Sequence, residues 1–242
     1  MKVLTLNLRH HRDRWGERFP LVVDVIRRHR PDLIGFQEVW RPIDQSDAIL
    51  EQVPELALEL KVVPKQGDYG REGIAIASRY PLLSHETLDL PGGERVAQRA
   101  VVDTGTFHLC LANTHLHDKP ADESIRLPQM RALLGWLAEV DAPTVLTGDM
   151  NAQPESSTIR AAKERYRSSY EAVHGSEPQA TFPTPLVSAT GPDQGSTIDY
   201  IFFSGDSLRV EAASIVADRS HPADETLYPS DHFGILAEIE FV

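Results

Sequence analysis

Apolar and polar residues alternate over short runs along much of the chain, and this period of two predicts many short β-strands. The first strand is expected from Lys2 to Leu8 and the second from Asp32 to Glu38. Further strands are expected at 58–63, 73–78, 83–88, 96–102, 106–114, 144–148, 197–203, 209–216 and 233–241. The segment Asp103-Thr104-Gly105 predicts a hairpin turn between two of them.

A helical spacing of apolar residues predicts helices between some of these strands. One is expected from 19 to 30, where Pro31 ends it, a second from 122 to 139, and a short third from 156 to 167. A long irregular loop is expected from 180 to 195. Several consecutive strands have connections too short for a crossover helix, so two packed sheets flanked by helices are favoured over one parallel sheet. The whole chain, 1–242, is expected to form a single domain.

The charge balance narrows the possible partners. The chain has 24 Lys and Arg against 36 Asp and Glu, a formal charge of −12, which argues against binding to an extended nucleic-acid duplex. Cys110 is the one cysteine of the sequence, so no intrachain disulfide can form. Asn7 and Arg9 interrupt the first apolar run too early for a signal peptide, and no apolar run reaches the length of a membrane span. We therefore expect a cytoplasmic monomer without integral membrane association.

Polar residues stand at the ends of the predicted strands, where a sheet fold can gather them at one edge. They are Asn7, Glu38, His115, Asp149 with Asn151, Asp199, and the pair Asp231-His232. Each has an ordinary alternative when taken alone. Glu38 fits a surface carboxylate and a metal ligand equally well. Asp149 and Asn151 fit an ordinary Asx-turn after the strand. The pair Asp231-His232 fits a solvated turn before the last strand.

Two histidines lie close together in the sequence, at His115 and His117. The spacing alone is typical of a zinc pair. However, the other candidate ligands are oxygen donors, which suit Mg²⁺ better than zinc. We therefore interpret His115 as a residue that handles phosphate or a proton, and His117 as peripheral.

The ordered set of motifs resembles the endonuclease/exonuclease/phosphatase superfamily, whose fold is that of DNase I. The motifs are Leu6-Asn7-Leu8, Gln37-Glu38-Val39, Asn113-Thr114-His115-Leu116, Gly148-Asp149-Met150-Asn151, Ile198-Asp199-Tyr200-Ile201 and Ser230-Asp231-His232, and the segment from Gly73 to Pro81 is also similar. This resemblance implies an α/β fold, a four-layered sandwich of two central, mostly antiparallel sheets flanked by helices.

The resemblance also implies a role for each residue. Asn7, Glu38 and Asp231 match positions around the metal, which we expect to be Mg²⁺, with Mn²⁺ as a substitute. Asp149 matches the residue that orients or deprotonates the attacking water, and Asn151 matches a partner of the phosphoryl oxygens. Asp199 matches the carboxylate that orients the histidine corresponding to His232, and His115 matches a second histidine found in many branches.

Asn7, Asn151 and His232 are also candidate ligands of the substrate phosphate. Three further predictions concern contacts with the substrate. Arg99 is a candidate phosphate ligand, although a surface arginine is nearly as consistent with its position. The basic loop from Arg9 to Arg14 can collect a phosphate, although a solvated charged loop is the safer interpretation. Phe182 either stacks on a base or anchors its loop to the core.

The sequence thus predicts a phosphoester hydrolase of the phosphodiesterase or nuclease type, in which a water activated by the metal and an aspartate attacks phosphorus. The alternatives are a phosphomonoesterase that acts on a small metabolite or a lipid head group, and a catalytically silent binding module on the same fold. A calcineurin-type phosphoesterase would need Asp-x-His and Gly-Asn-His, and a serine hydrolase would need Gly-x-Ser-x-Gly, and the sequence has none of these. The expected substrate is a small molecule or a single-stranded nucleic acid.

Overall fold

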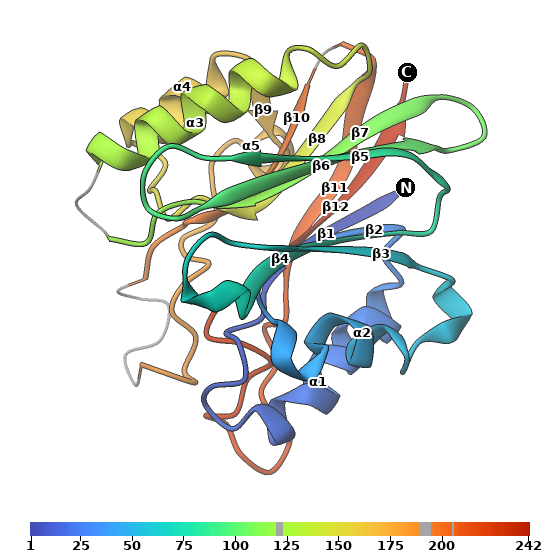
Figure 1. Ribbon diagram of the computed structural model, residues 1–242. Coiled ribbons are helices and arrows are strands. Elements are labelled where there is room, and N and C mark those ends of the chain that lie inside the picture. Colours follow the sequence, from blue (N-terminus) through green and yellow to red (C-terminus); the bar gives the residue numbers. More distant parts are fainter. Residues whose placement is uncertain (120–122, 189–194, 205) are drawn as a thin grey trace.

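The computed structural model of this chain describes residues 1–119, 123–188, 195–204 and 206–242. Two six-stranded sheets pack face to face, and helices cover the outer face of each sheet (Figure 1). This arrangement confirms the predicted four-layered α/β sandwich. Among the helices of the described residues, none is both long enough and apolar enough to cross a membrane.

The first sheet combines strands from the beginning and the end of the chain. Its strand order is β11-β12-β1-β2-β4-β3. β1 and β2 are parallel, and the other pairs are antiparallel. The strands are β1 (Lys2–Asn7), β2 (Leu33–Trp40), β3 (Glu59–Pro64), β4 (Glu72–Ser78), β11 (Leu208–Val216) and β12 (Gly234–Phe241).

The second sheet is formed by the middle of the chain, in the order β5-β6-β7-β8-β10-β9. Here β7 and β8 are parallel, and the remaining pairs are antiparallel. The strands are β5 (Leu82–Asp89), β6 (Val96–Asp103), β7 (His108–His115), β8 (Thr144–Asp149), β9 (Tyr166–Ser168) and β10 (Asp199–Ser204). The predicted hairpin joins β6 to β7, and Gly105 takes a positive φ of 86° in its turn.

Each outer face of the sandwich has its own helices. α1 (Trp15–His29) and α2 (Gln45–Leu50) lie on the first sheet, while α3 (Glu123–Leu137) and α4 (Ser157–Lys163) lie on the second (Figure 1). α5 (Ser169–His174) contacts β11 and β10, and short 3-10 helices occur at Arg41–Ile43, Pro54–Leu56 and Asp68–Gly70. A third apolar cluster, which includes Val3, Ile76, Leu111 and Ile201, fills the space between the sheets.

The helices differ from the sequence prediction at a few points. The segment expected to be one helix from 156 to 167 is α4 followed by β9, whose register with β10 pairs Phe202 with Ser168. α2 and α5 were not predicted, because helices of six residues depend on tertiary packing rather than on their own propensity. The predicted helix start at Asp122 and the centre of the loop from 180 to 195 lie outside the described residues.

The strand registers bring the polar strand ends together. Asn7 pairs with Gln37 at the end of the parallel strands β1 and β2. His115 pairs with Asp149 at the end of the parallel strands β7 and β8, and Asp199 of β10 pairs with Asp149 from the other side. All of these strand ends meet at one edge of the sandwich, which is the edge that the sequence predicted for the site.

Candidate active site

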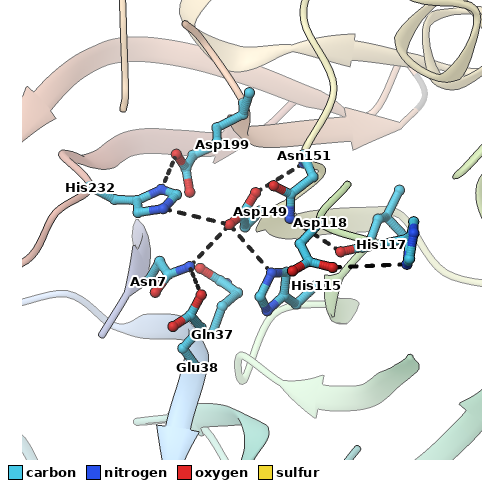
Figure 2. Close-up of polar contacts among 12 residues, drawn as sticks. Asn7, Gln37, Glu38, His115, His117, Asp118, Asp149, Asn151, Asp199 and His232 are labelled. Carbon is cyan, nitrogen blue, oxygen red and sulfur yellow. Dashed lines mark hydrogen bonds and ion pairs between the residues drawn. The ribbon is translucent and has the colours of Figure 1, made fainter. Parts of the chain in front are cut away.

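Asp149 lies at the centre of the gathered polar residues, and its carboxylate receives groups from both sheets (Figure 2). Its Oδ2 accepts a hydrogen bond of 3.0 Å from the amide of Asn7, and Nε2 of His115 lies 3.5 Å from the same oxygen. Nε2 of His232 is 3.8 Å away. Oδ1 accepts a hydrogen bond of 2.9 Å from the backbone N–H of Asn151. The buried carboxylate of Asp149 is therefore oriented by hydrogen bonds from groups of both sheets.

The electrostatic surroundings of Asp149 favour its protonated form. Burial and, after it, the nearby charge of Asp199 raise the pKa of Asp149 to about 7, against the opposing influence of His232. A base whose pKa lies near the working pH suits proton transfer at neutral pH. The environment of Asp149 is thus that of a general base.

Asp199 and His232 form a hydrogen-bonded pair next to Asp149 (Figure 2). Nδ1 of His232 lies 2.8 Å from Oδ2 of Asp199, and both side chains are buried. Burial disfavours the imidazolium, but the carboxylates of Asp199, Asp231 and Asp149 outweigh it and raise the pKa of His232 well above its ordinary value. These contacts favour the imidazolium form of His232, and its Nε2 faces Oδ2 of Asp149.

Glu38 occupies a β-bulge at the end of β2. The register of β2 with β4 shifts between Phe36 and Val39, and Glu38 takes a positive φ of 51°. Such backbone conformations are uncommon for residues other than glycine and concentrate at functional sites. The bulge turns the carboxylate toward the site, where Oε1 accepts a hydrogen bond of 3.3 Å from Asn7.

Asp231 reaches the site from the segment just before β12. The loop that contains Thr184 holds this segment, because the N–H of Thr184 donates to the carbonyl of Asp231 at 2.8 Å and its hydroxyl donates to the carbonyl of Ser230 at 2.6 Å. Oδ2 of Asp231 lies 3.0 Å from the guanidinium of Arg9. Burial and the charge of Glu38 raise the pKa of Asp231, although His232 and Arg9 oppose the shift.

The donor set fits a hard divalent cation. Asp149 and Asp231 are buried carboxylates whose pKa values are raised first by burial, so a bound cation would stabilise their charged forms. Glu38, Asp231 and the amide of Asn7 offer oxygen donors of the kind that Mg²⁺ prefers. Asp149, Asp199 and His232 also have ligand atoms within 4.8 Å of one another. However, the imidazolium of His232 is a donor and cannot act as a metal ligand at the same time.

A cavity of about 710 Å³ opens over these residues, a volume suited to a small organic ligand. It is lined by the polar strand-end residues Glu38, His115, Asp149, Asn151, Asp231 and His232. Asp118, Gln153, Glu155, Ser156 and Phe182 also line it, among others.

The structure does not bring Arg99 to the cavity, and this corrects the prediction that Arg99 contacts phosphate. The guanidinium lies over the ring of Trp136 at 4.2 Å from its centroid and donates to Glu86 at 2.7 Å. Arg99 thus points to the outer face of the second sheet, where α3 covers it. The reason is the pleat of β6, which alternates side chains between the two faces.

Two other predictions concerned loops. In the basic loop, Arg9 lines the cavity and is paired with Asp231 and Asp13, whereas Arg14 is paired with Glu17 and Asp224 on the surface. Phe182 also lines the cavity, and its ring lies 4.8 Å from that of His232. Both Arg9 and Phe182 are therefore placed to contact a substrate.

Several residues of the site were not assigned individual roles from the sequence. His10 bridges two carboxylates, with Nε2 at 2.9 Å from Glu38 and 3.0 Å from Glu72, and these contacts raise the pKa of His10 to about 9 despite its burial. Arg95 precedes β6 and lies 3.1 Å from Nδ1 of His115. Glu72 and Arg95 also stand at strand ends, so the same positional signal could have identified them. His117 is not among the residues that line the cavity.

Comparison with known proteins agrees with this geometry. The sequence pattern of the Endonuclease/Exonuclease/phosphatase family matches residues 4–232. Nocturnin of Xenopus laevis is 25% identical over 94% of this chain, which spans 65% of the length of that protein.

Two solved structures show the same fold. A mannosyl-6-phosphatase of Bacteroides thetaiotaomicron has a TM-score of 0.79 and 22% identity, with 100% of both chains covered. TDP2 of D. rerio, complexed with a single-strand DNA product, has a TM-score of 0.81 and 16% identity, covering 99% of this chain and 98% of that one.

Proposed function

Because the chain belongs to the endonuclease/exonuclease/phosphatase family, we propose that it is a Mg²⁺-dependent phosphoester hydrolase, of the phosphodiesterase or nuclease type, acting on a small or single-stranded phosphorylated substrate. The observation that carries this proposal is the arrangement around Asp149. One buried carboxylate with a pKa raised to about 7 has an imidazolium and a second imidazole within 4 Å, and this set can activate a water and bind a phosphoryl group.

Each side chain has a distinct task in the proposed reaction. Asp149 orients the attacking water and accepts its proton, since its carboxylate is held by Asn7 and by the N–H of Asn151. His232 donates a charged hydrogen bond to a phosphoryl oxygen, and Asp199 holds its ring. His115 and the side-chain amide of Asn151 offer further donors to the phosphoryl oxygens.

Glu38 and Asp231, with Asn7, are the residues that would hold the metal. A Mg²⁺ ion held by these residues, or Mn²⁺ in its place, would supply positive charge that offsets the charge at phosphorus and at the nucleophile or the leaving oxygen. The pKa of Asp231 supports this role, because burial and then the charge of Glu38 raise it, and a bound cation would favour the charged carboxylate.

The cavity and the charge of the chain support a small or single-stranded substrate. The cavity of about 710 Å³ has room for one nucleotide or one phosphorylated sugar beside the reacting phosphate. The formal charge of −12 disfavours an extended duplex. A phosphomonoesterase acting on a small metabolite is the second candidate, because a cavity of about 710 Å³ also suits a small phosphorylated metabolite.

Hydrolysis assays can test the proposal. The substrates are bis-p-nitrophenyl phosphate, p-nitrophenyl phosphate, a single-stranded oligonucleotide and an abasic duplex, each with Mg²⁺, with Mn²⁺ and with a chelator. We expect metal-dependent turnover that Asp149→Ala and His232→Ala abolish, whereas His108→Ala, at the exposed opposite end of β7, leaves it unchanged. Turnover that survives the chelator would contradict metal dependence, and inactivity on all four substrates with either metal would count against the hydrolase.

A further inference from the structure

Arg95 lies behind His115, on the side away from Asp149. Its side chain is buried. NH1 of Arg95 lies 3.1 Å from Nδ1 of His115, and NH2 lies 3.1 Å from Oδ1 of Asp118. Glu72 stands next to both, with Oε1 at 3.7 Å from Arg95 NH1 and 3.8 Å from Nδ1 of His115.

The contact between Arg95 and His115 determines which ring nitrogen of His115 carries the proton. A guanidinium has N–H groups that donate hydrogen bonds and no atom that accepts one. Nδ1 of His115 must therefore be the acceptor, which leaves the proton of the neutral ring on Nε2. Burial and the charge of Arg95 lower the pKa of His115 well below its ordinary value, so the neutral ring persists at neutral pH.

Nε2 of His115 faces the reaction site, at 3.5 Å from Oδ2 of Asp149. Nε2 of His232 faces the same oxygen at 3.8 Å. Two imidazole N–H groups thus flank one carboxylate oxygen, and one ring is neutral while the other is charged.

Glu72 and Arg95 favour opposite tautomers of His115. A carboxylate next to Nδ1 accepts a hydrogen bond, so it favours a proton on Nδ1, whereas Arg95 favours a proton on Nε2. Arg95 makes the shorter contact, at 3.1 Å against 3.8 Å for Glu72. If the proton moved to Nδ1, Nε2 would become an acceptor directed at a negatively charged substrate, and the donor would be lost.

We propose that Arg95 is a positioning residue that fixes His115 as the tautomer with its proton on Nε2, and so directs a neutral N–H donor at the phosphoryl group. The use of this donor in turnover rests on the proposed function, but the tautomer does not. Arg95 also pairs with Asp118, which lines the same cavity as His115.

The tautomer can be measured directly by NMR. Long-range ¹H–¹⁵N correlation of ¹⁵N-histidine-labelled protein distinguishes a protonated from an unprotonated ring nitrogen, and the loss of one set of signals in His115→Gln assigns His115. In the unaltered protein we expect the proton on Nε2. In Arg95→Met we expect it on Nδ1, because Glu72 becomes the nearest polar partner of that nitrogen. A proton on Nδ1 in the unaltered protein, or the same tautomer in both proteins, overturns the proposal.

Kinetics test the consequence for turnover. Arg95→Met should lower kcat/KM by about 10²-fold, mainly through kcat, which is the usual effect of losing one donor to the transition state. Arg99→Met is the matched control, since it removes a second buried guanidinium of the same sheet that faces Trp136 instead of the site. Arg95→Lys keeps a donor and should retain both the Nε2–H tautomer and part of the activity, so a proton on Nδ1 in Arg95→Lys would also contradict the proposal.

The two readouts separate the possible failures. If Arg95→Met inverts the tautomer but leaves kcat/KM equal to that of Arg99→Met, His115 is not used as a donor and the catalytic part of the proposal is wrong. If the protein hydrolyses no phosphoester but NMR shows the tautomer that depends on Arg95, the structural inference stands and the proposed function fails.

Discussion

Asp199→Asn removes one negative charge from the site and keeps the number of heavy atoms in the side chain. In the protein, Nδ1 of His232 lies 2.8 Å from Oδ2 of Asp199, and both residues are buried. Hydrogen bonds to charged groups contribute about 1.5–3 kcal/mol, which corresponds to a factor of about 10–150 in rate if the bond strengthens in the transition state. We expect kcat/KM to fall within that range.

The pH dependence provides a second, more specific signature. Asp199 contributes most to raising the pKa of His232, so its replacement moves this pKa back toward the ordinary value. The imidazolium then loses its proton as the pH rises through the neutral range. The loss of activity in Asp199→Asn should therefore grow as the pH rises from 6 to 8, a range that includes the ordinary histidine pKa of roughly 6.5.

The fold should tolerate this change, since among the described residues Oδ1 of Asp199 is buried without a hydrogen-bond partner. The charge of Asp199 also raises the pKa of Asp149, so its removal relieves a repulsion. The assay is hydrolysis of bis-p-nitrophenyl phosphate with Mg²⁺, alongside thermal unfolding and the control Asp206→Asn, an exposed carboxylate beyond the far end of β10. A kcat/KM within threefold of the unaltered protein from pH 6 to pH 8 would refute the role assigned to this pair.

Three other predictions follow from the site and the interior. Because the pKa of Asp149 is raised to about 7 and its carboxylate form is the base, kcat/KM should rise with pH through about 7, and saturating Mg²⁺ should move this inflection to lower pH in the same titration. Glu38→Gln should raise the Mg²⁺ concentration for half-maximal activity by at least tenfold, measured by metal titration, while thermal unfolding stays near that of the unaltered protein. Gly35→Ala should destabilise the fold by about 1–3 kcal/mol in urea unfolding, because its Cβ would lie 2.0 Å from Oγ1 of Thr147, whereas Gly135→Ala in α3 meets nothing within 4 Å and should stabilise it by about 0.5–1 kcal/mol.

The sequence predicted the layers of the fold and most strand positions because alternating burial follows directly from the pleat. It also located the residues that surround Asp149, since each stands at a strand end. Parallel pairing of β1 with β2 and of β7 with β8 then places these ends at one edge. Local sequence was enough for this part of the site.

The arginines show where local sequence fails. Arg95 and Arg99 differ by four positions and both are buried, yet one contacts His115 and the other Trp136. Only the placement of β6 relative to α3 and β7 distinguishes them. Arg18 is a similar case, because its buried guanidinium donates to the carbonyls of the loop after β1 and to that of Pro229, a partner 211 positions away. Such contacts depend on tertiary structure and leave no periodic signal.

The strand order of the first sheet has a consequence for the order of events during synthesis. β1 lies between β2 and β12, so it can gain β2 as a neighbour early, but β12 only after that strand has left the ribosome. The second sheet is continuous from β5 to β10 and can complete itself sooner. Asp231 and His232 lie just before β12, so the last strand to pair is also the one that brings them to Glu38 and Asp149. A nascent chain therefore brings all of the proposed site residues together only when β12 joins the first sheet.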